Sequence, residues 1–119
     1  MILKKLIVGS LATNTYIFGS SEIKEVVIID PGDEANRIID SIEKLKSKPI
    51  AVLLTHGHYD HTFAVRKVQR FFKIPLMFSK KEFDSGIYTH KKADRWLSEG
   101  DSIKVGEIIT GFMVPKDLI

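Results

Sequence analysis

Two uninterrupted runs of apolar residues constrain the fold more than any other feature of the sequence. They lie at residues 26–29 (VVII) and 50–54 (IAVLL). A strand that is apolar at every position has both faces covered, which is typical of interior strands flanked by helices. Between the runs, apolar side chains recur at helical spacing, at Ala35, Ile38, Ile39, Ile42 and Leu45. Strand, helix and strand in this order predict an α/β fold with a layered sheet.

Further elements are predicted on both sides of this unit. In order they are strands 3–9, 14–18 and 25–30, a helix at 34–46, a strand at 50–54, a helix marked by Ala64, Val65, Val68, Phe71 and Phe72, and a strand at 75–78. Gly19-Ser20-Ser21 is expected to join the second and third strands. Pro31 and Gly32 form a turn after the third strand, and the first helix is expected to end near Pro49.

Length and composition are those of a single globular domain, with 119 residues of which 44% are hydrophobic. No stretch is long and apolar enough for a membrane span. The apolar run at the N-terminus stops after Val8, too early for a signal peptide, so we expect a cytoplasmic protein without a membrane partner. The chain has no cysteine, which excludes disulfides and thiolate ligands. Any metal site must therefore use nitrogen and oxygen ligands.

The net charge of +3 is mild, and basic residues cluster at 66–73 (RKVQRFFK) and 90–96 (HKKADRW) beside aromatic residues. Such stretches can bind nucleic acid, but they are also typical of a solvated helix face next to core aromatics. We favour the second interpretation.

Three of the four histidines lie within six residues, at His56, His58 and His61, and Asp60 lies among them. This cluster falls between the end of a predicted interior strand and the start of a helix, where ligands bind in open α/β sheets. In an extended loop, His56 and His58 would point the same way and could share one ion. Asp60 and His61 could reach a second position. A cluster with this alternation favours metal binding over isolated surface histidines.

The segment THGHYDH resembles the H-x-H-x-D-H signature of the metallo-β-lactamase superfamily. Upstream, the residues at 14–33 resemble the opening hairpin of that superfamily and its buried aspartate turn. The combination of NTY, IDPG and LLTHGHYDH is most similar to the glyoxalase II-like hydrolases, and residues 97–107 are similar to the family's L-x-D-G-D-x-I-x-x-G turn. The resemblance implies the N-terminal half of an αββα sandwich, with a mixed β-sheet flanked by helices, so residues 1–119 would be one incomplete domain.

The resemblance also implies one or two zinc ions, or iron or manganese in their place. By position, His56 and His58 would bind the first ion, Asp60 and His61 the second, and Asp30 would support the site from beneath. A bound dication lowers the pKa of water from about 15.7 to roughly 7. The implied reaction is attack by metal-activated hydroxide on a small thioester or ester, as in hydroxyacylglutathione hydrolases. Asp60 is then also the candidate catalytic residue, as a ligand that holds the nucleophile.

The C-terminal ligands of the family have no counterpart in this chain. The family's T-P-G-H-T loop would fall near residues 114–117 (VPKD), where the glycine and histidine are absent. Asp117 could offer an oxygen ligand there. His90 comes too early to match the family's third ligand, and its basic surroundings are typical of a surface histidine. We also expect an apolar sheet face and an unpaired edge near residues 103–114, which would favour a homo-oligomer.

Three functions remain open from the sequence. The first is a metal-dependent thioester or ester hydrolase. The second is a catalytically inactive half-fold that binds metal or self-associates. The third is a relative of the RNA-processing nucleases of the superfamily, which the basic stretches support only weakly.

Overall fold

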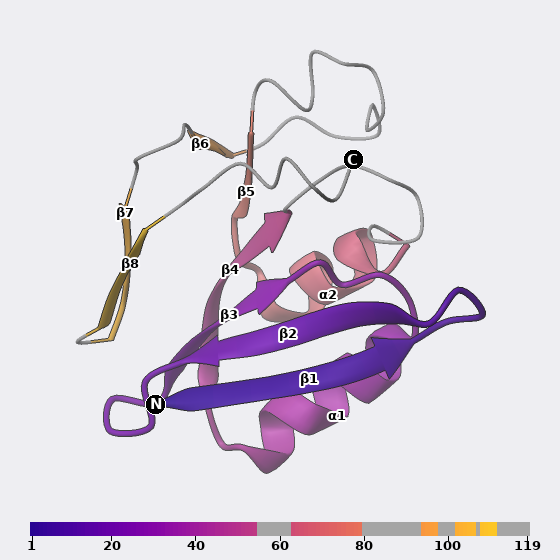
Figure 1. Cartoon of the computed structure of the whole chain (residues 1–119), viewed down its shortest axis with the longest axis horizontal. Helices are drawn as coiled ribbons and strands as arrows, with labels where there is room; N and C mark the ends of the chain where they lie inside the picture. The colour runs from indigo at the N-terminus through magenta and orange to yellow at the C-terminus, as the bar shows by residue number, and fades with distance from the viewer. Residues whose placement is uncertain (55–62, 80–93, 98–101, 107, 112–119) are drawn as a thin grey trace.

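The computed structural model describes residues 1–54, 63–79, 94–97, 102–106 and 108–111. Its strands and helices, in chain order, are β1 (Ile2–Val8), β2 (Thr13–Gly19), β3 (Glu25–Ile29), α1 (Ala35–Lys44), β4 (Lys48–Leu54), α2 (Val65–Phe72), β5 (Leu76–Ser79), β6 (Arg95–Leu97), β7 (Ser102–Val105) and β8 (Ile108–Gly111). Figure 1 shows β1 to β6 side by side in one sheet, with β7 and β8 apart from it.

The larger sheet is mixed and follows the order β1-β2-β3-β4-β5-β6. Strands β1, β2 and β3 form an antiparallel meander, and the pairs from β3 to β6 are parallel. Parallel neighbours need a crossover connection. Helix α1 makes that connection between β3 and β4, and α2 lies between β4 and β5. The α/β class predicted from the alternation of elements is therefore confirmed.

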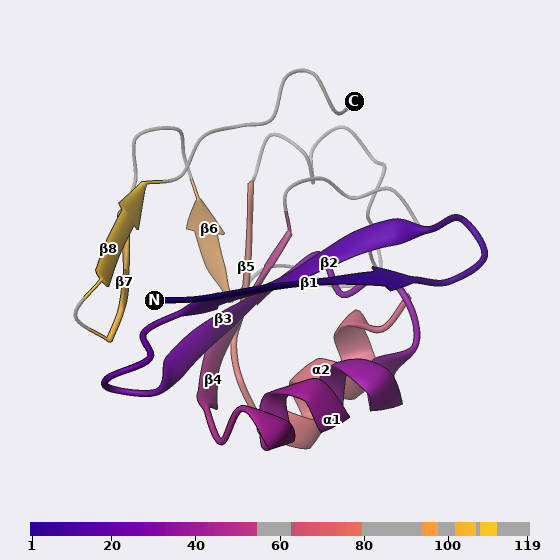
Figure 2. The same ribbon diagram turned by 60° about the horizontal axis from the view of Figure 1, so that its bottom comes forward.

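Both helices cover the same face of the sheet (Figure 2). The core on this side contains Val26 and Ile28 of β3, Ile38 and Ile42 of α1, and Val68 of α2, all fully buried. The opposite face has its own smaller cluster of Val27, Ala51, Leu53 and Val105. Successive residues of β3 thus enter different clusters, as expected when a strand is covered on both sides. The prediction that 26–29 is an interior strand is confirmed.

The turn between β2 and β3 begins one residue later than predicted, at Ser20. Gly19 is still part of β2 and pairs with Val26, so the turn occupies residues 20–24. Ser20 organises this turn, because its backbone N–H donates to the carbonyl of Glu25 and its hydroxyl accepts from the N–H of Ile23. Short polar side chains commonly stabilise turns in this way. A side chain at Gly19 would collide with the backbone of Glu25, which explains why glycine occupies this end of β2.

Pro49 lies inside β4, although the sequence pattern placed the strand after it. Proline has no N–H to donate, so it is tolerated in sheets mainly at edges and bulges. The register between β3 and β4 shifts between Val26 and Val27, next to the Val26–Pro49 pair. This irregularity accommodates the proline, and β4 begins two residues earlier than predicted, at Lys48.

Helix α1 begins one residue later than predicted because Glu34 has a left-handed backbone, with φ of 53°, and it ends two residues earlier, at Lys44. In α2, Val65 and Val68 are buried as expected, but Phe71 is 56% exposed. Phe71 instead packs edge-on against Phe72, with ring centroids 5.0 Å apart. Neither helix of the described chain is long and apolar enough to cross a membrane.

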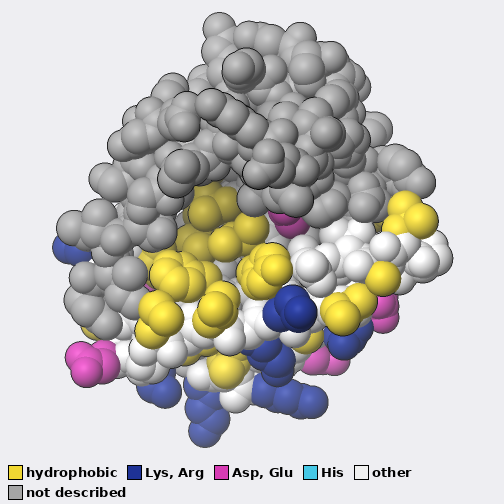
Figure 3. Space-filling model, in the orientation of Figure 1, with side chains coloured by type: hydrophobic (Ala, Val, Ile, Leu, Met, Phe, Trp, Pro, Cys, Tyr) yellow, Lys and Arg dark blue, Asp and Glu magenta, His cyan; other side chains and the backbone are white. Residues whose placement is uncertain are grey.

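The β7–β8 hairpin lies on the side of the sheet away from the helices. Val105 of β7 is buried against β3 and β4, and the N–H of Gly106 donates to Oε1 of Glu25 at 2.9 Å. Apolar side chains gather over much of the remaining described part of this face, with a basic side chain among them, as Figure 3 shows. Its residues include the exposed Leu3 and Ile7 and the partly buried Phe18, Ile29, Ile50 and Met77.

Candidate functional site

All six residues proposed as metal ligands lie outside the described residues. Four of them belong to residues 55–62, hereafter the histidine segment, namely His56, His58, Asp60 and His61. The others are His90 and Asp117. Within the part of the chain that the structure describes, no group of three or more histidine and acidic residues could hold a metal ion. The described structure therefore shows how the chain is held on either side of the histidine segment.

The described chain on either side of the histidine segment bonds to one turn, formed by residues 30–32 and called the Asp30 turn below. On the upstream side, the N–H of Asp30 donates to the carbonyl of Leu53 at 2.9 Å. On the downstream side, the N–H of Ala64 donates to the carbonyl of Pro31 at 3.0 Å. Leu53 lies in β4 and Ala64 precedes α2. One short turn thus holds the chain on both sides of the histidine segment.

Asp30 itself is buried, with 4% of its surface exposed, and has a left-handed backbone with φ of 52°. Left-handed geometry costs a non-glycine residue free energy, although aspartate tolerates it better than most residues. Such strain persists where surrounding contacts over-determine the conformation. Asp30 is buried, as predicted, and its place beneath the candidate site stays a prediction. Its role towards a metal stays a prediction.

The buried side chain of Thr15 holds the Asp30 turn from the neighbouring strand. Its hydroxyl donates to the carbonyl of Asp30 at 2.7 Å and accepts from the N–H of Gly32 at 3.3 Å. Thr15 is fully buried and lies one position beyond the Tyr16–Ile29 pair of β2 and β3. One hydroxyl therefore satisfies the backbone groups on both sides of Pro31.

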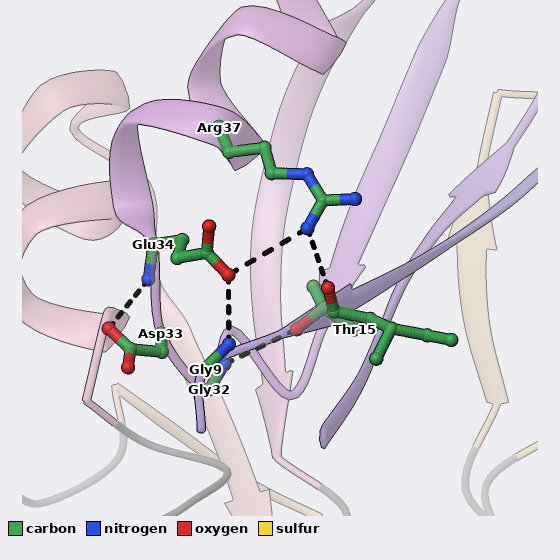
Figure 4. A network of polar contacts seen from close by, with 7 residues as sticks. Gly9, Thr15, Gly32, Asp33, Glu34 and Arg37 are labelled. Carbon is green, nitrogen blue, oxygen red and sulfur yellow. Dashed lines mark hydrogen bonds and ion pairs between the residues drawn. The ribbon is translucent and has the colours of Figure 1, made fainter. Parts of the chain in front are cut away.

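A second network holds the loop between β1 and β2 against the start of α1 (Figure 4). The carboxylate of Glu34 accepts from the N–H of Gly9 at 2.8 Å and lies 3.7 Å from Nη1 of Arg37. Nη1 of Arg37 also donates to the carbonyl of Ile7 at 2.6 Å, and Asp33 accepts from the N–H of Glu34. The hairpin loop is thereby fixed next to the residues that follow the Asp30 turn.

Two hollows open beside Phe63, the residue that directly follows the histidine segment. A cavity of about 100 Å³ lies between the β1–β2 loop and Phe63, and its lining includes Val8, Leu11 and Asp33. A larger one, of about 530 Å³, lies between the start of α1 and the start of α2. A further cavity, of about 630 Å³, runs along α2 from Arg66 and is also lined by Asp94. Its described lining includes one acidic residue and no histidine, so we do not assign the candidate site to it.

The sequence did not indicate three groups that hold this region, namely the side chains of Thr15 and Glu34 and the N–H of Ala64. The alternation of β2 could have indicated Thr15, because Ile17 on the same face belongs to the helix-side core. For Glu34 no sequence signal exists, since it bonds Gly9, which is 25 positions away.

Comparison with known proteins identifies the family. The family model of the metallo-beta-lactamase superfamily matches residues 8–116. The chain belongs to this superfamily. A B3 metallo-beta-lactamase, BLEG-1, has a similar structure, with a TM-score of 0.78 and 32% sequence identity over 92% of this chain and 59% of that chain. The predicted fold, the N-terminal half of the metallo-β-lactamase sandwich, is therefore confirmed.

Two further relatives bear on chemistry. A hydroxyacylglutathione hydrolase of Bdellovibrio bacteriovorus is 34% identical over 76% of this chain and 34% of its own length. A protein crystallised in a di-iron-bound form, TTHA1623, is 26% identical, with a TM-score of 0.70, over 84% of this chain and 56% of that chain. This chain spans between 33% and 56% of the length of eight curated relatives that it matches.

Proposed function

We propose that this chain carries the metal-binding half of a metal-dependent hydrolase that cleaves a thioester or an ester. The observation that carries the proposal is the position of the four candidate ligands. His56, His58, Asp60 and His61 all fall in the histidine segment, and the Asp30 turn bonds Leu53 before this segment and Ala64 after it. In open α/β sheets, this position after an interior parallel strand is where ligands bind.

The chemistry of these side chains fits a dication. Imidazole nitrogen and carboxylate oxygen suit zinc, iron and manganese, and the chain has no thiolate that would select a softer metal. We propose zinc, with iron as the alternative that the di-iron relative supports. When bound, such an ion makes hydroxide available at neutral pH.

In this proposal His56 and His58 hold one ion, and Asp60 and His61 hold the second. Asp60 also fixes the position of the nucleophile, and Asp30 supports the ligands from the buried turn. The substrate is proposed as a small acyl thioester. The hydroxyacylglutathione hydrolase among the relatives supports this class, and the hollow that Val8, Leu11 and Phe63 line offers an apolar surface to an acyl group.

Metal content per chain, measured by elemental analysis on protein without a histidine tag, tests the first half of the proposal. We expect one or two ions in the wild type and their loss in the double variant His56→Ala/His58→Ala. The matched control is His90→Ala, which removes a histidine outside the histidine segment and should keep the metal. Equal metal in the wild type and the double variant, or none in either, would overturn the proposal.

Turnover distinguishes the remaining functions. An acylglutathione thioester and a simple aryl ester are offered to metal-loaded protein, with and without chelator. Hydrolysis that the chelator and Asp60→Ala both abolish would support the hydrolase. Metal binding without hydrolysis of either compound would favour the inactive metal-binding half-fold. For the RNA-processing alternative, binding of RNA that weakens steeply with salt would be required.

A further inference from the structure

Pro31 offers no hydrogen-bond donor to the Asp30 turn, and the hydroxyl of Thr15 bonds the backbone groups on either side of it. Proline has no N–H, so the turn cannot use this position to hold itself together. The carbonyl of Asp30 and the N–H of Gly32 on either side of Pro31 both bond the hydroxyl of Thr15. Thr15 is 0% exposed, so neither group could turn to water if that hydroxyl were removed. Two buried backbone groups would then lose a partner, which is costly.

The same turn touches the chain before and after the histidine segment. Asp30 bonds Leu53 through its N–H, and Pro31 bonds Ala64 through its carbonyl. Thr15 bonds the carbonyl of Asp30 and the N–H of Gly32, so it holds the same short turn that makes these two bonds. A shift of the turn would therefore move Leu53 and Ala64 relative to each other. It would also release Asp30 from its left-handed backbone conformation, which has φ of 52°.

We propose that Thr15 is a positioning residue for metal binding, because its buried hydroxyl fixes the turn that bonds both Leu53 and Ala64, the described residues that flank the histidine segment. This inference rests on the function proposed above. Thr15 contacts no ligand in the proposal and acts only through the Asp30 turn. Ligands that are held in place lose less freedom on binding an ion than ligands on a loose loop, so affinity depends on such support.

The test compares three variants. Thr15→Val keeps the shape of the side chain and removes the hydroxyl. Thr15→Ser keeps the hydroxyl and removes a methyl group. Ile42→Val is the control, because it removes a methyl group from a fully buried site on α1 that has no bond to the turn. Each protein is prepared metal-free and titrated with Co²⁺ in competition with a chelator, and binding is followed by the visible absorption of the bound cobalt.

We expect Thr15→Val to weaken cobalt binding by about 10- to 100-fold, the range typical when support of a metal ligand is lost. Thr15→Ser should restore most of the affinity, and Ile42→Val should bind as the wild type does. Binding by Thr15→Val equal to that of the wild type would overturn the inference. An equal loss in Ile42→Val would also overturn it, because general destabilisation would then explain the effect.

Amide hydrogen exchange in the metal-free proteins gives a second readout. In Thr15→Val, the N–H groups of Gly32 and Ala64 should exchange faster than in Ile42→Val, while those of α1 should match. Unchanged exchange at both positions would contradict the positioning role. If the wild type binds no cobalt at all, the proposed function fails and the role of Thr15 towards metal fails with it. That outcome is distinct from a wild type that binds cobalt and a Thr15→Val variant that binds equally well.

Discussion

Gly19 stands at a position where the backbone leaves no room for a side chain. A Cβ there would lie 2.0 Å from the carbonyl oxygen of Glu25 and 2.7 Å from Cα of Val26. Both atoms belong to the backbone of the next strand and cannot rotate away. The methyl group of an alanine could be accommodated only by separating β2 from β3 at the turn.

We therefore expect Gly19→Ala to lower the free energy of unfolding by about 3 kcal/mol, at the upper end of the usual cost of overpacking. Urea denaturation followed by circular dichroism measures the change. Ser21→Ala, in the exposed turn beyond the strand, is the control and should shift stability far less. A Gly19→Ala variant as stable as the control would show that the turn can relax around the methyl group.

Lys73 offers the opposite case, because its backbone already has the conformation that glycine prefers. It ends α2 with φ of 56°, and its N–H donates to the carbonyl of Gln69. Glycine is the usual residue at such helix ends, since it has no Cβ to strain. Lys73→Gly should raise the free energy of unfolding by about 0.5–1 kcal/mol. Lys67→Gly, inside the same helix, should lower it, and thermal denaturation of both variants would show whether the signs differ.

The residues that hold the candidate site could be predicted only in part. The position of Asp30 followed from IDPG, because Pro31 and Gly32 mark a turn after an apolar strand. The bonds of Thr15 and Glu34 could not be predicted, since each depends on a register between segments that are 15 and 25 residues apart. Local patterns specify the turn, whereas long-range pairing specifies what supports it.

At the scale of elements, α2 shows that helical spacing predicts a helix but not which of its apolar residues are buried. Val68 is fully buried and Phe71, three positions later, is mostly exposed. Both fit an apolar pattern at spacings of three and four. The sheet that α2 covers is limited to one side of the helix, and Phe71 lies beyond that side.

This difference predicts unequal effects of truncating two apolar residues of one helix. Val68→Ala should lower the free energy of unfolding by about 2 kcal/mol, from lost burial and a small cavity. Phe71→Ala should change it by less than about 1 kcal/mol, because more than half of this side chain is already exposed and it makes one edge-on ring contact. Chemical denaturation of both variants tests this order. A larger loss for Phe71→Ala would place that ring in a buried contact.

Strand β4 shows a second limit of pattern reading. The pattern predicted a strand from residue 50, because proline normally interrupts a sheet. The strand starts at Lys48 and includes Pro49, beside the register shift against β3. Since the irregularity is a property of the pair of strands, the sequence of β4 alone could not reveal it.

At the scale of the whole molecule, the two faces of the larger sheet differ. Helices α1 and α2 cover one face. On the described part of the other face, Val105 of β7 covers only a portion. Strands β7 and β8 pair with each other and with no other strand among those described. Sheet edges and apolar surfaces of this kind favour pairing with another chain. We propose that this chain self-associates through the edge near residues 103–114 and the apolar face beside it.

Sedimentation velocity over a range of concentrations tests this proposal. The wild type should form dimers or larger assemblies as the concentration rises. Leu3→Lys, which places a charge on the apolar face, should shift the protein towards monomer. Phe71→Lys is the matched control, because Phe71 is 56% exposed on α2, which covers the opposite face, and Leu3 is 63% exposed on the sheet. A wild type that stays monomeric at every concentration would contradict the proposal.

The overall topology was the most predictable level, because the alternation of apolar strands and amphipathic helices allows few arrangements. The histidine segment was recognisable from its spacing alone. The way its ends are held was not predictable, since the bonds of the Asp30 turn join β3 to the residues before and after that segment.

The attachment of both ends to one turn has a consequence for redesign. The hydrogen bonds described there join backbone groups of Leu53 and Ala64 to backbone groups of Asp30 and Pro31. Because such bonds do not depend on side-chain identity, we expect the residues between Leu53 and Ala64 to be exchangeable. A different set of ligands could be grafted there, for another metal or for none, while the scaffold that presents them keeps its own bonds.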